Sequence, residues 1–307
     1  MTSRDKKKIL TVCHDTGSAE VVSAYAAKNR GRFSFASYAA GPAVPVFERR
    51  KLRFAAIRDI KHARNEARGI LEKHADAVLL LSGTSGGGSP LETAFIREAK
   101  RRGMRTASFL EHWVSYRERF SYPAAGWRKN LPDEIWVGDR AAERIACRLF
   151  PMKIVKVKFV PNPYFAEIKE RFRALHKRKG SPRDILYLSD PVGYERAVLE
   201  DLLRLLVKTK SRRELIIRLH PVEPRDKYIG LVKRFGDKLR IRESKGGDLL
   251  QDIAKSSLVV GGRSNALVLA FLCGKKVIGV IPSGAKDKPL PFEGIKNVKR
   301  LSAKDLS

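Results

Sequence analysis

The chain has 307 residues, with 63 Lys and Arg against 33 Asp and Glu, and a formal net charge of +30. This length exceeds what one ordinary core needs and suits two domains. The apolar runs are far too short to cross a bilayer, and residues 1–8 enter a strand without the apolar core of a signal peptide. We therefore expect a cytoplasmic protein.

The positive charge favours polyanionic partners and leaves two interpretations open. The basic surface can serve only solubility and weak adhesion, or it can hold a specific anionic surface such as the inner face of a membrane. No aromatic-basic RNA motif, zinc finger or helix-turn-helix occurs, so specific nucleic-acid binding is not expected. The cysteines, at positions 13, 147 and 273, lie in apolar contexts without metal-like spacing, so we expect reduced core residues.

The first strand is predicted at residues 8–13, and a helix follows through residue 27. Between them lie polar and Gly residues, at the end of a strand where open α/β sheets bind ligands. An ordinary turn between strand and helix is the equal alternative. The candidate site residues here are His14, Asp15, Thr16, Gly17 and Ser18. A second strand is predicted at 33–40, then a loop at 41–45 and a basic helix at 55–74.

A buried strand at 75–82 leads into a Gly-rich loop, residues 83–88. The loop is neither a Walker A nor a Rossmann glycine motif. Three adjacent Gly residues favour close approach of a substrate to the backbone over simple flexibility. The candidates are Thr84, Ser85, Gly86 and Gly87. Ser89, Pro90 and Glu92 then read as a capping box that starts a helix ending near Gly103.

Residues 105–110 form the next predicted strand, which ends on Glu111 and His112. Glu111 is a candidate general base, and His112 can orient it or carry a proton. Alternatively Glu111 pairs with Arg117 or Arg119, while Trp113 and Tyr116 fill the core. Further strands are expected within 131–139 and at 155–160, around a helix at 141–150. The first domain is predicted to end at 163, and 164–184 to be a basic linker.

The second half, 185–307, repeats the alternation of strand and helix, which predicts parallel sheets and the α/β class. Strands are expected at 184–189, 215–219, 239–241, 258–260 and 276–280, with helices at 190–208, 225–236 and 247–255. The strand at 215–219 ends on His220-Pro221. After 258–260 comes Gly261-Gly262, then an apolar helix that Ser264 caps and Gly274 ends. A buried helix that starts on such a turn is an anion site. After residue 280 the apolar pattern fades.

His220-Pro221 at a strand end, followed by Gly-Gly-x-Ser264, resembles the His-Pro and Ser motifs of bacterial surface-glycan transferases of the GT-B fold. These are the polysialyltransferases, the capsule Kdo transferases and the CDP-glycerol glycerophosphotransferases. The resemblance implies two Rossmann-like domains facing a cleft, with His220 and Ser264 holding the phosphate and cytidine of the donor. The predicted donor site comprises Arg218, His220, Pro221, Gly261, Gly262, Arg263, Ser264 and Asn265.

One departure concerns the donor. Many GT-B enzymes carry a Glu in this helix that binds the ribose, but residues 266–272 contain no carboxylate. This favours a CMP- or CDP-activated sugar over a UDP- or GDP-sugar. No Asp-x-Asp metal motif stands out, so we expect neither a catalytic metal nor a cofactor.

The first hypothesis is a glycosyltransferase in which Glu111 or Asp15 deprotonates a glycan or lipid-linked acceptor. A UDP-sugar 2-epimerase is the second, although such enzymes need several carboxylates and His residues. A non-catalytic, basic polyanion-binding protein is the third.

Overall fold

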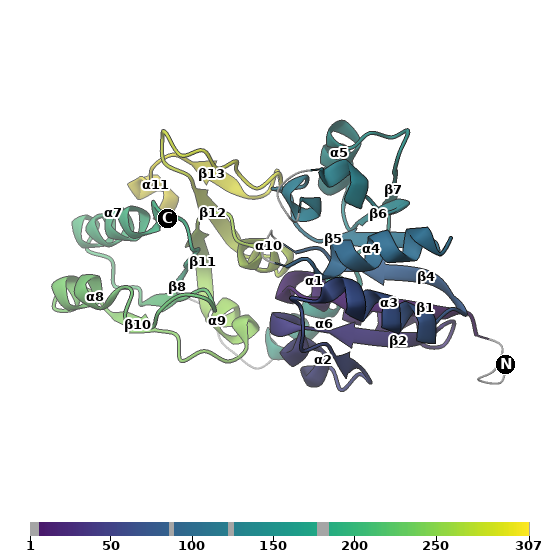
Figure 1. Cartoon of the computed structure of the whole chain (residues 1–307). Helices are drawn as coiled ribbons and strands as arrows, with labels where there is room; N and C mark the ends of the chain where they lie inside the picture. The colour runs from purple at the N-terminus through teal and green to yellow at the C-terminus, as the bar shows by residue number, and fades with distance from the viewer. Residues whose placement is uncertain (1–5, 86–88, 122–125, 177–183, 307) are drawn as a thin grey trace. The chain divides into compact units, whose positions relative to one another are not determined.

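The computed structural model describes residues 6–85, 89–121, 126–176 and 184–306. The chain divides into two compact units, Met1–Tyr164 and Phe165–Ser307. Each unit is built on its own parallel sheet (Figure 1). Residues 86–88, which include the predicted site residues Gly86 and Gly87, lie outside the described residues.

Unit 1 holds a seven-stranded parallel sheet in the order β3-β2-β1-β4-β5-β6-β7. Its strands are β1 (Lys8–Cys13), β2 (Ser34–Ala39), β3 (Ala55–Ala56), β4 (Ala77–Ser82), β5 (Thr106–Leu110), β6 (Glu134–Val137) and β7 (Lys156–Phe159). Its helices are α1 (Thr16–Asn29), α2 (Val44–Arg49), α3 (Ala63–Lys73), α4 (Leu91–Arg101) and α5 (Arg140–Leu149), with short 3-10 turns η2 (Gly41–Ala43), η3 (Glu118–Phe120) and η4 (Trp127–Asn130).

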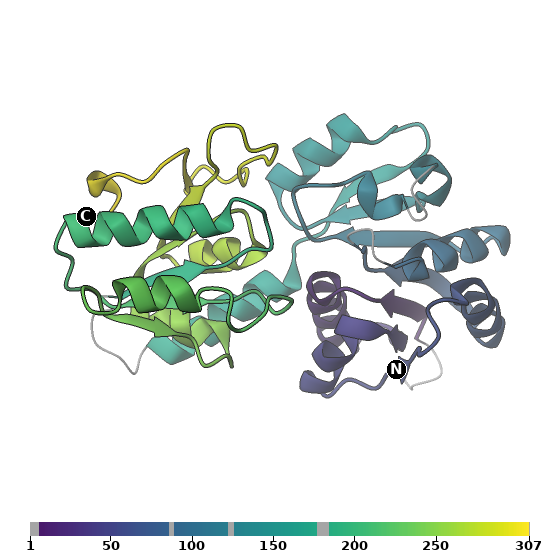
Figure 2. The ribbon, with the colours of Figure 1, turned by 60° about the vertical axis from the view of Figure 1, so that its left-hand side comes forward.

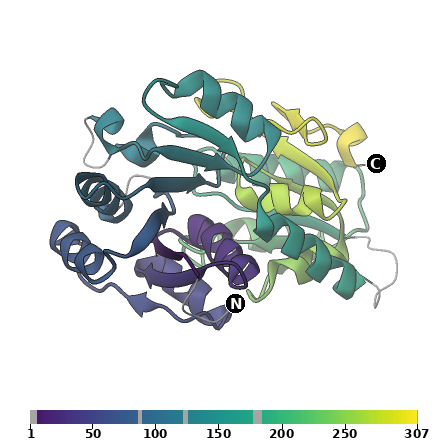
Figure 3. The same cartoon turned by 90° about the vertical axis from the view of Figure 1, so that its right-hand side faces the viewer.

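Right-handed crossovers place α1 on one face of this sheet and α3 and α4 side by side on the other (Figure 3). Strands β1 and β5 are almost wholly buried, and β4 is buried from Leu80 to Ser82, because helices cover both faces of the sheet there. The carboxyl ends of these strands therefore emerge from a rigid core.

Unit 2 holds a six-stranded parallel sheet in the order β10-β9-β8-β11-β12-β13. Its strands are β8 (Asp184–Leu188), β9 (Leu215–Arg218), β10 (Ile241–Glu243), β11 (Ser256–Gly261), β12 (Lys276–Val280) and β13 (Lys296–Val298). Its helices are α7 (Glu195–Lys208), α8 (Ile229–Phe235), α9 (Leu249–Lys255), α10 (Asn265–Leu272) and α11 (Ala303–Leu306). Figure 2 shows α7 and α8 in front of the sheet and α10 behind it.

The α/β prediction with two Rossmann-like domains is confirmed, because both sheets have the doubly wound order. Several elements differ from expectation. Residues 55–74 do not form one helix, since β3 and a loop precede α3. The whole of the loop predicted at 41–45 is helical, in η2 and the start of α2, and the helix predicted from 190 begins only at Glu195.

The region predicted as a basic linker is largely helical. Helix α6 (Pro163–His176) runs across the boundary between the units, and Ile168 and Phe172 are buried. The basic residues alternate with this apolar stripe, so composition alone suggested a linker where an amphipathic helix forms. Residues 177–183 lie outside the described part of the chain.

Candidate functional site

Each sheet reverses its direction of winding at one pair of neighbouring strands. In unit 1 the pair is β1 and β4, and in unit 2 it is β8 and β11. The loops that leave the carboxyl ends of such a pair diverge toward opposite faces, which opens the crevice where doubly wound domains bind ligands. The predicted residues 14–18 and 84–85 lie at the first of these points, and 261–265 at the second.

Glu92 joins the loops of the unit 1 switch point. Its Oε1 accepts from the backbone N–H of His14 at 2.8 Å, and its Oε2 accepts from Ser85 Oγ at 2.8 Å. Burial raises the pKa of Glu92 to about 7. The sequence assigned Glu92 only to a capping box. The structure places this carboxylate in the cluster, which no local signal could have shown.

His14 and Asp15 form a close pair beside Glu92. His14 Nδ1 lies 2.8 Å from Asp15 Oδ1, and this hydrogen bond raises the pKa of His14. The Asp15 side chain is 34% exposed, against 14% for His14. Asp15 is thus a carboxylate at the switch point that an incoming hydroxyl can reach.

The remaining residues of this loop fix its position. Thr16 Oγ1 donates to the Pro42 carbonyl at 3.4 Å, and Ser18 Oγ donates to the Asp15 carbonyl at 3.1 Å. A Cβ atom on Gly17 would lie 3.3 Å from Glu111 Cγ, so the loop and the end of β5 are in contact.

Glu111 is held in a buried ion pair. Its Oε1 lies 2.7 Å from Arg119 Nη1, and its Oε2 accepts from Thr84 Oγ1 at 2.9 Å. The side chains of Glu111 and Arg119 are only 5% and 9% exposed. Both carboxylate oxygens are therefore occupied, which agrees with the structural alternative and weakens Glu111 as a base.

The residues after Glu111 are also largely structural. Trp113 and Tyr116 are buried, and Trp113 Nε1 donates to Asp139 Oδ2 at 2.8 Å. His112 Nδ1 accepts from the Trp113 backbone N–H at 3.0 Å. This end of β5 therefore supports the cluster through packing.

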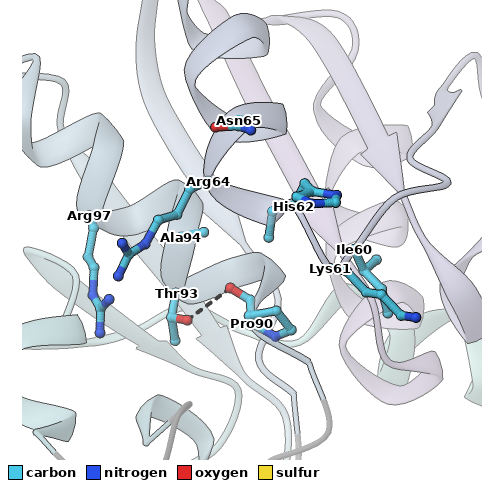
Figure 4. Close-up of a pocket in the computed structure, with 10 residues that line it drawn as sticks. Ile60, Lys61, His62, Arg64, Asn65, Pro90, Thr93, Ala94 and Arg97 are labelled. Carbon is cyan, nitrogen blue, oxygen red and sulfur yellow. Dashed lines mark hydrogen bonds between the residues drawn. The ribbon is translucent and has the colours of Figure 1, made fainter.

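A basic pocket of about 520 Å³ lies between the start of α3 and the start of α4 (Figure 4). Lys61, His62, Arg64 and Arg97 line it, and none of its described lining residues is a carboxylate. Burial, and then the charges of Arg64 and Arg101, lower the pKa of Arg97. An anion in this pocket would relieve that repulsion.

In unit 2, the turn between β11 and α10 approaches a neighbouring strand. A Cβ atom on Gly261 would lie 2.6 Å from the carbonyl oxygen of Leu188, at the end of β8. Gly261 is thus required by close backbone approach within the fold. Gly274, with φ of +74°, follows the end of α10 as predicted.

The start of α10 presents unpaired polar groups. Ser264 occupies the N-cap position, but its hydroxyl caps no backbone N–H. Ser264 Oγ and Asn265 Oδ1 are buried and make no hydrogen bond within the described residues. Buried polar atoms normally have partners, so these atoms fit a ligand at the helix N-terminus.

His220 lies in a turn fixed by Glu223. Glu223 Oε2 accepts from the His220 backbone N–H at 2.9 Å, and His220 Nδ1 accepts from the Val222 N–H at 3.4 Å. Nδ1 as acceptor implies that neutral His220 carries its proton on Nε2. Pro221 is exposed beside it.

Arg218, a predicted donor-site residue, is held by neighbouring groups of unit 2. Its Nη1 lies 2.8 Å from Asp252 Oδ2, and its Nη2 donates to the Gly247 carbonyl at 2.7 Å. The guanidinium thus ties the end of β9 to the loop before α9.

Asp190, which the sequence did not single out, lies against the Gly-Gly turn. Its Oδ2 accepts from the Arg263 N–H at 3.3 Å, and it would lie 3.4 Å from a Cβ atom on Gly262. Burial raises its pKa. The Arg263 side chain pairs with Asp287, 3.1 Å away. Asp190 follows a predicted strand end, which was the available signal.

Comparison with solved structures supports this assignment of fold. HepE of Anabaena, solved with UDP-glucose, matches with a TM-score of 0.62 and 13% identity, over 89% of this chain and 80% of that chain. The UDP-GlcNAc 2-epimerase of Neisseria meningitidis, bound to UDP-GlcNAc, gives 0.63 and 13%, over 89% and 82%. MurG of Acinetobacter baumannii gives 0.56 and 11%, over 91% and 80%.

The chain has a GT-B-like fold. No protein-family model and no curated protein sequence matches it. Within the described residues, no helix is long and apolar enough to cross a membrane, and no group of three His, Cys, Asp or Glu side chains is placed to hold a metal ion. Among the cysteines, Cys13 is buried as expected, whereas Cys147 is exposed.

Proposed function

We propose that the protein is a glycosyltransferase that takes a sugar from a nucleotide-activated donor, with the donor phosphate at the N-terminus of α10. The observation that carries this proposal is the pair of buried, unpartnered atoms Ser264 Oγ and Asn265 Oδ1 at that helix end, within the described part of unit 2. Ser264 can donate to a phosphate oxygen, and Asn265 Oδ1 can accept from a ribose hydroxyl. The helix dipole and free N–H groups favour the negative charge.

His220 supports the same proposal through its tautomer. With Nδ1 accepting from Val222, Nε2–H is available as a donor. A donor at this position stabilises the charge that develops on the phosphate as the bond to the sugar breaks. His220 would thus act on the leaving group rather than on the acceptor.

The acceptor hydroxyl must lose its proton as it attacks the anomeric carbon of the sugar. Of the predicted bases, we favour Asp15, because Glu111 is held by Arg119 and Thr84 while Asp15 remains 34% exposed. The basic pocket of Lys61, Arg64 and Arg97 suits an acidic group of the acceptor, such as that of a cell-surface glycan.

The donor base is a separate part of the proposal. Helix α10 contains no carboxylate for the ribose, which favours a cytidine nucleotide. The structures of HepE and of the Neisseria epimerase hold UDP-sugars, which keeps uridine as the competing choice. Asp190 is a buried carboxylate that could accept a hydrogen bond from a ribose hydroxyl, in place of a carboxylate on α10.

A nucleotide-sugar 2-epimerase is the second candidate, and the unit 1 cluster favours it. His14, Asp15 and Glu111 follow neighbouring strands, and Glu92, at the start of α4, contacts His14; burial raises the pKa of Glu92 to about 7. An epimerase must remove and return a proton at a sugar carbon, and the partly exposed His14–Asp15 pair suits that task, whereas both Glu92 oxygens are occupied by His14 and Ser85. The sequence had suggested too few such groups.

A calorimetric screen against CMP, CDP, UDP and GDP at about 0.15 M salt tests the donor site. We expect one base to bind best and both Ser264→Ala and His220→Ala to weaken that binding by tenfold or more. Ser283→Ala, an exposed serine in the same unit, is the matched control. Equal binding of all four nucleotides, unchanged by these substitutions, would leave only a basic polyanion-binding protein.

Product analysis then separates the two enzymes. With the selected nucleotide bearing a sugar, a transferase leaves a free nucleotide and a glycosylated acceptor, whereas an epimerase returns a nucleotide-sugar with inverted C2. Asp15→Asn is expected to reduce transfer strongly while nucleotide binding is kept. Epimerised donor without transfer would overturn the first proposal in favour of the second.

A further inference from the structure

An apolar turn lies exposed at the edge of unit 1, between α5 and β7. Leu149, Met152 and Ile154 are 36%, 49% and 50% exposed. Half of the six exposed large hydrophobic side chains in the described residues thus fall within six positions of the chain. Among the described residues of unit 1, no strand pairs with the outer side of β7, the edge strand of the sheet. Clustered exposed apolar side chains mark an interaction surface.

An aromatic side chain flanked by arginines adjoins this turn. The Trp127 ring lies 6.1 Å from the Phe150 ring, and Arg117 and Arg128 lie over Trp127 at 5.4 and 5.3 Å. Arg117 also donates to the Leu149 carbonyl at 3.5 Å. Trp with cationic neighbours is the combination found at the boundary between lipid headgroups and acyl chains.

The charge around the turn is predominantly positive. Between residues 144 and 166 the sequence has no Asp or Glu. The exposed basic side chains of this segment are Arg144, Arg148, Lys153, Lys156 and Lys158. The nearest carboxylates on α5 are occupied, because Glu143 pairs with Arg140 at 2.7 Å and Asp139 bonds Trp113 and Ala142. Glu118, exposed beside Arg117, and Glu134, 3.7 Å from Lys158, are acidic side chains at the rim.

We propose that this surface, residues 148–154 with Trp127, docks the protein on an anionic lipid bilayer. Leu149, Met152 and Ile154 would enter the interfacial region, while the surrounding Lys and Arg contact the lipid phosphates. A patch of a few apolar side chains gives only weak binding by itself, and each basic residue near an anionic surface adds to it. The strong excess of positive over negative side chains at the rim favours a lipid surface over a protein partner, whose interfaces carry charges of both signs. The inference is independent of the nucleotide site in unit 2.

Co-sedimentation of the full chain with lipid vesicles tests this proposal at about 0.15 M salt. One set of vesicles is phosphatidylcholine, and the other also contains phosphatidylglycerol. We expect binding to the second set only. Met152→Ser combined with Ile154→Ser should lower the partition coefficient roughly tenfold, because two apolar side chains that would enter the bilayer interface are lost. Lys153→Gln combined with Lys156→Gln should lower it and reduce its dependence on salt.

Matched control variants distinguish binding through this surface from nonspecific binding caused by the net charge of +30. Ile229→Ser combined with Val78→Ser removes two exposed apolar side chains elsewhere, and Lys233→Gln combined with Lys238→Gln removes two exposed charges from unit 2. Both controls should bind like the parent chain. Since all substituted side chains are exposed, the variants should keep the parent melting temperature.

Cys147, exposed on α5 next to residues 148–154, is a labelling position for a local fluorescence measurement. In a Cys273→Ser background, an environment-sensitive dye on Cys147 should shift its emission to the blue with the anionic vesicles only. The proposal fails if the chain does not bind anionic vesicles, if the control variants lose as much binding as the Met152 and Ile154 variant, or if the dye emission stays unchanged.

Discussion

The Oε1 atom of Glu92, at the start of α4, accepts a hydrogen bond from the backbone N–H of His14, 2.8 Å away at the end of β1. Ser85, at the end of β4, donates to the other oxygen at 2.8 Å. One buried carboxylate therefore fastens together the two strand ends that form the switch point of unit 1. The protonation state of the Glu92 carboxylate is therefore linked to the stability of unit 1.

Glu92→Gln should remove a pH dependence of stability. Burial raises the pKa of Glu92 from 4.5 to about 7. Below pH 4.5 folded and unfolded chains both hold the proton, so the group contributes nothing. From there to about pH 7 the unfolded chain loses the proton first, so the free energy of unfolding falls, by roughly 3 kcal/mol in all. The Gln variant keeps an acceptor for His14, so it should match the parent near pH 4.5 and exceed its stability above pH 7.

Urea unfolding across this pH range measures the effect. Glu72→Gln, an exposed position on α3, is the control and should follow the parent curve. A Glu92→Gln curve that also runs parallel to the parent would show that Glu92 does not titrate in this range.

Arg119→Met should destabilise the protein strongly. It leaves the Glu111 carboxylate buried without its cation, at a cost of about 3 to 5 kcal/mol. Adding Glu111→Leu should recover much of this loss, because two apolar side chains replace the ion pair. Chemical denaturation of both single variants and the double variant gives the coupling energy. Additive losses would mean that the pair does not act as a unit.

Gly261→Ala should destabilise the protein, because its Cβ atom would lie 2.6 Å from the Leu188 carbonyl oxygen. A shift of the β8 and β11 backbones should cost about 1 to 3 kcal/mol. Gly193→Ala is the matched control, since its Cβ would meet nothing within 4 Å. Thermal unfolding of the two variants should differ by several degrees. Equal melting temperatures would contradict the close approach of these strands.

Asp15→Asn should lower the pKa of His14, whose pKa is raised chiefly by its hydrogen bond to Asp15. In the parent, the charged His14 stabilises the fold at acid pH, and this contribution is lost as pH rises through the raised pKa. Proton NMR of the His14 ring measures the change directly. Asp226→Asn, exposed in unit 2, should leave the His14 titration in place. An unchanged titration in Asp15→Asn would show that Asp15 is not the partner in solution.

Local patterns predicted many elements well. The strands at 8–13 and 276–280 have the expected bounds, because their apolar runs are flanked by polar and Gly residues. Patterns failed where charge concealed an apolar stripe, as in α6, and where an element was very short, as in β3 and β13. In such places the distant partner strand or core, rather than the local sequence, decides the conformation.

The candidate site also combines residues that the local sequence indicated with contacts that only the folded chain makes. The His-Pro pair, the Gly-Gly turn and Ser264 could be singled out because each is a short motif of adjacent residues, and their assignment to a donor site stays a prediction. His14, one hydrogen-bond partner of Glu92, lies 78 residues away in the sequence, and Asp190 bonds Arg263 across 73 residues. The occupation of Glu111 by Arg119, and of Arg218 by Asp252, depends on how loops from separate strands meet.

The sequence by itself therefore determined the α/β class, the two domains and the strand ends where candidate residues lie, since these follow from local alternation of apolar and polar residues. Only the tertiary structure decided which carboxylates are held in ion pairs, which are protonated near neutral pH, and which polar atoms at the start of α10 remain without partners. Those properties depend on burial and on hydrogen-bond geometry, which exist only after distant strands pair in the sheet.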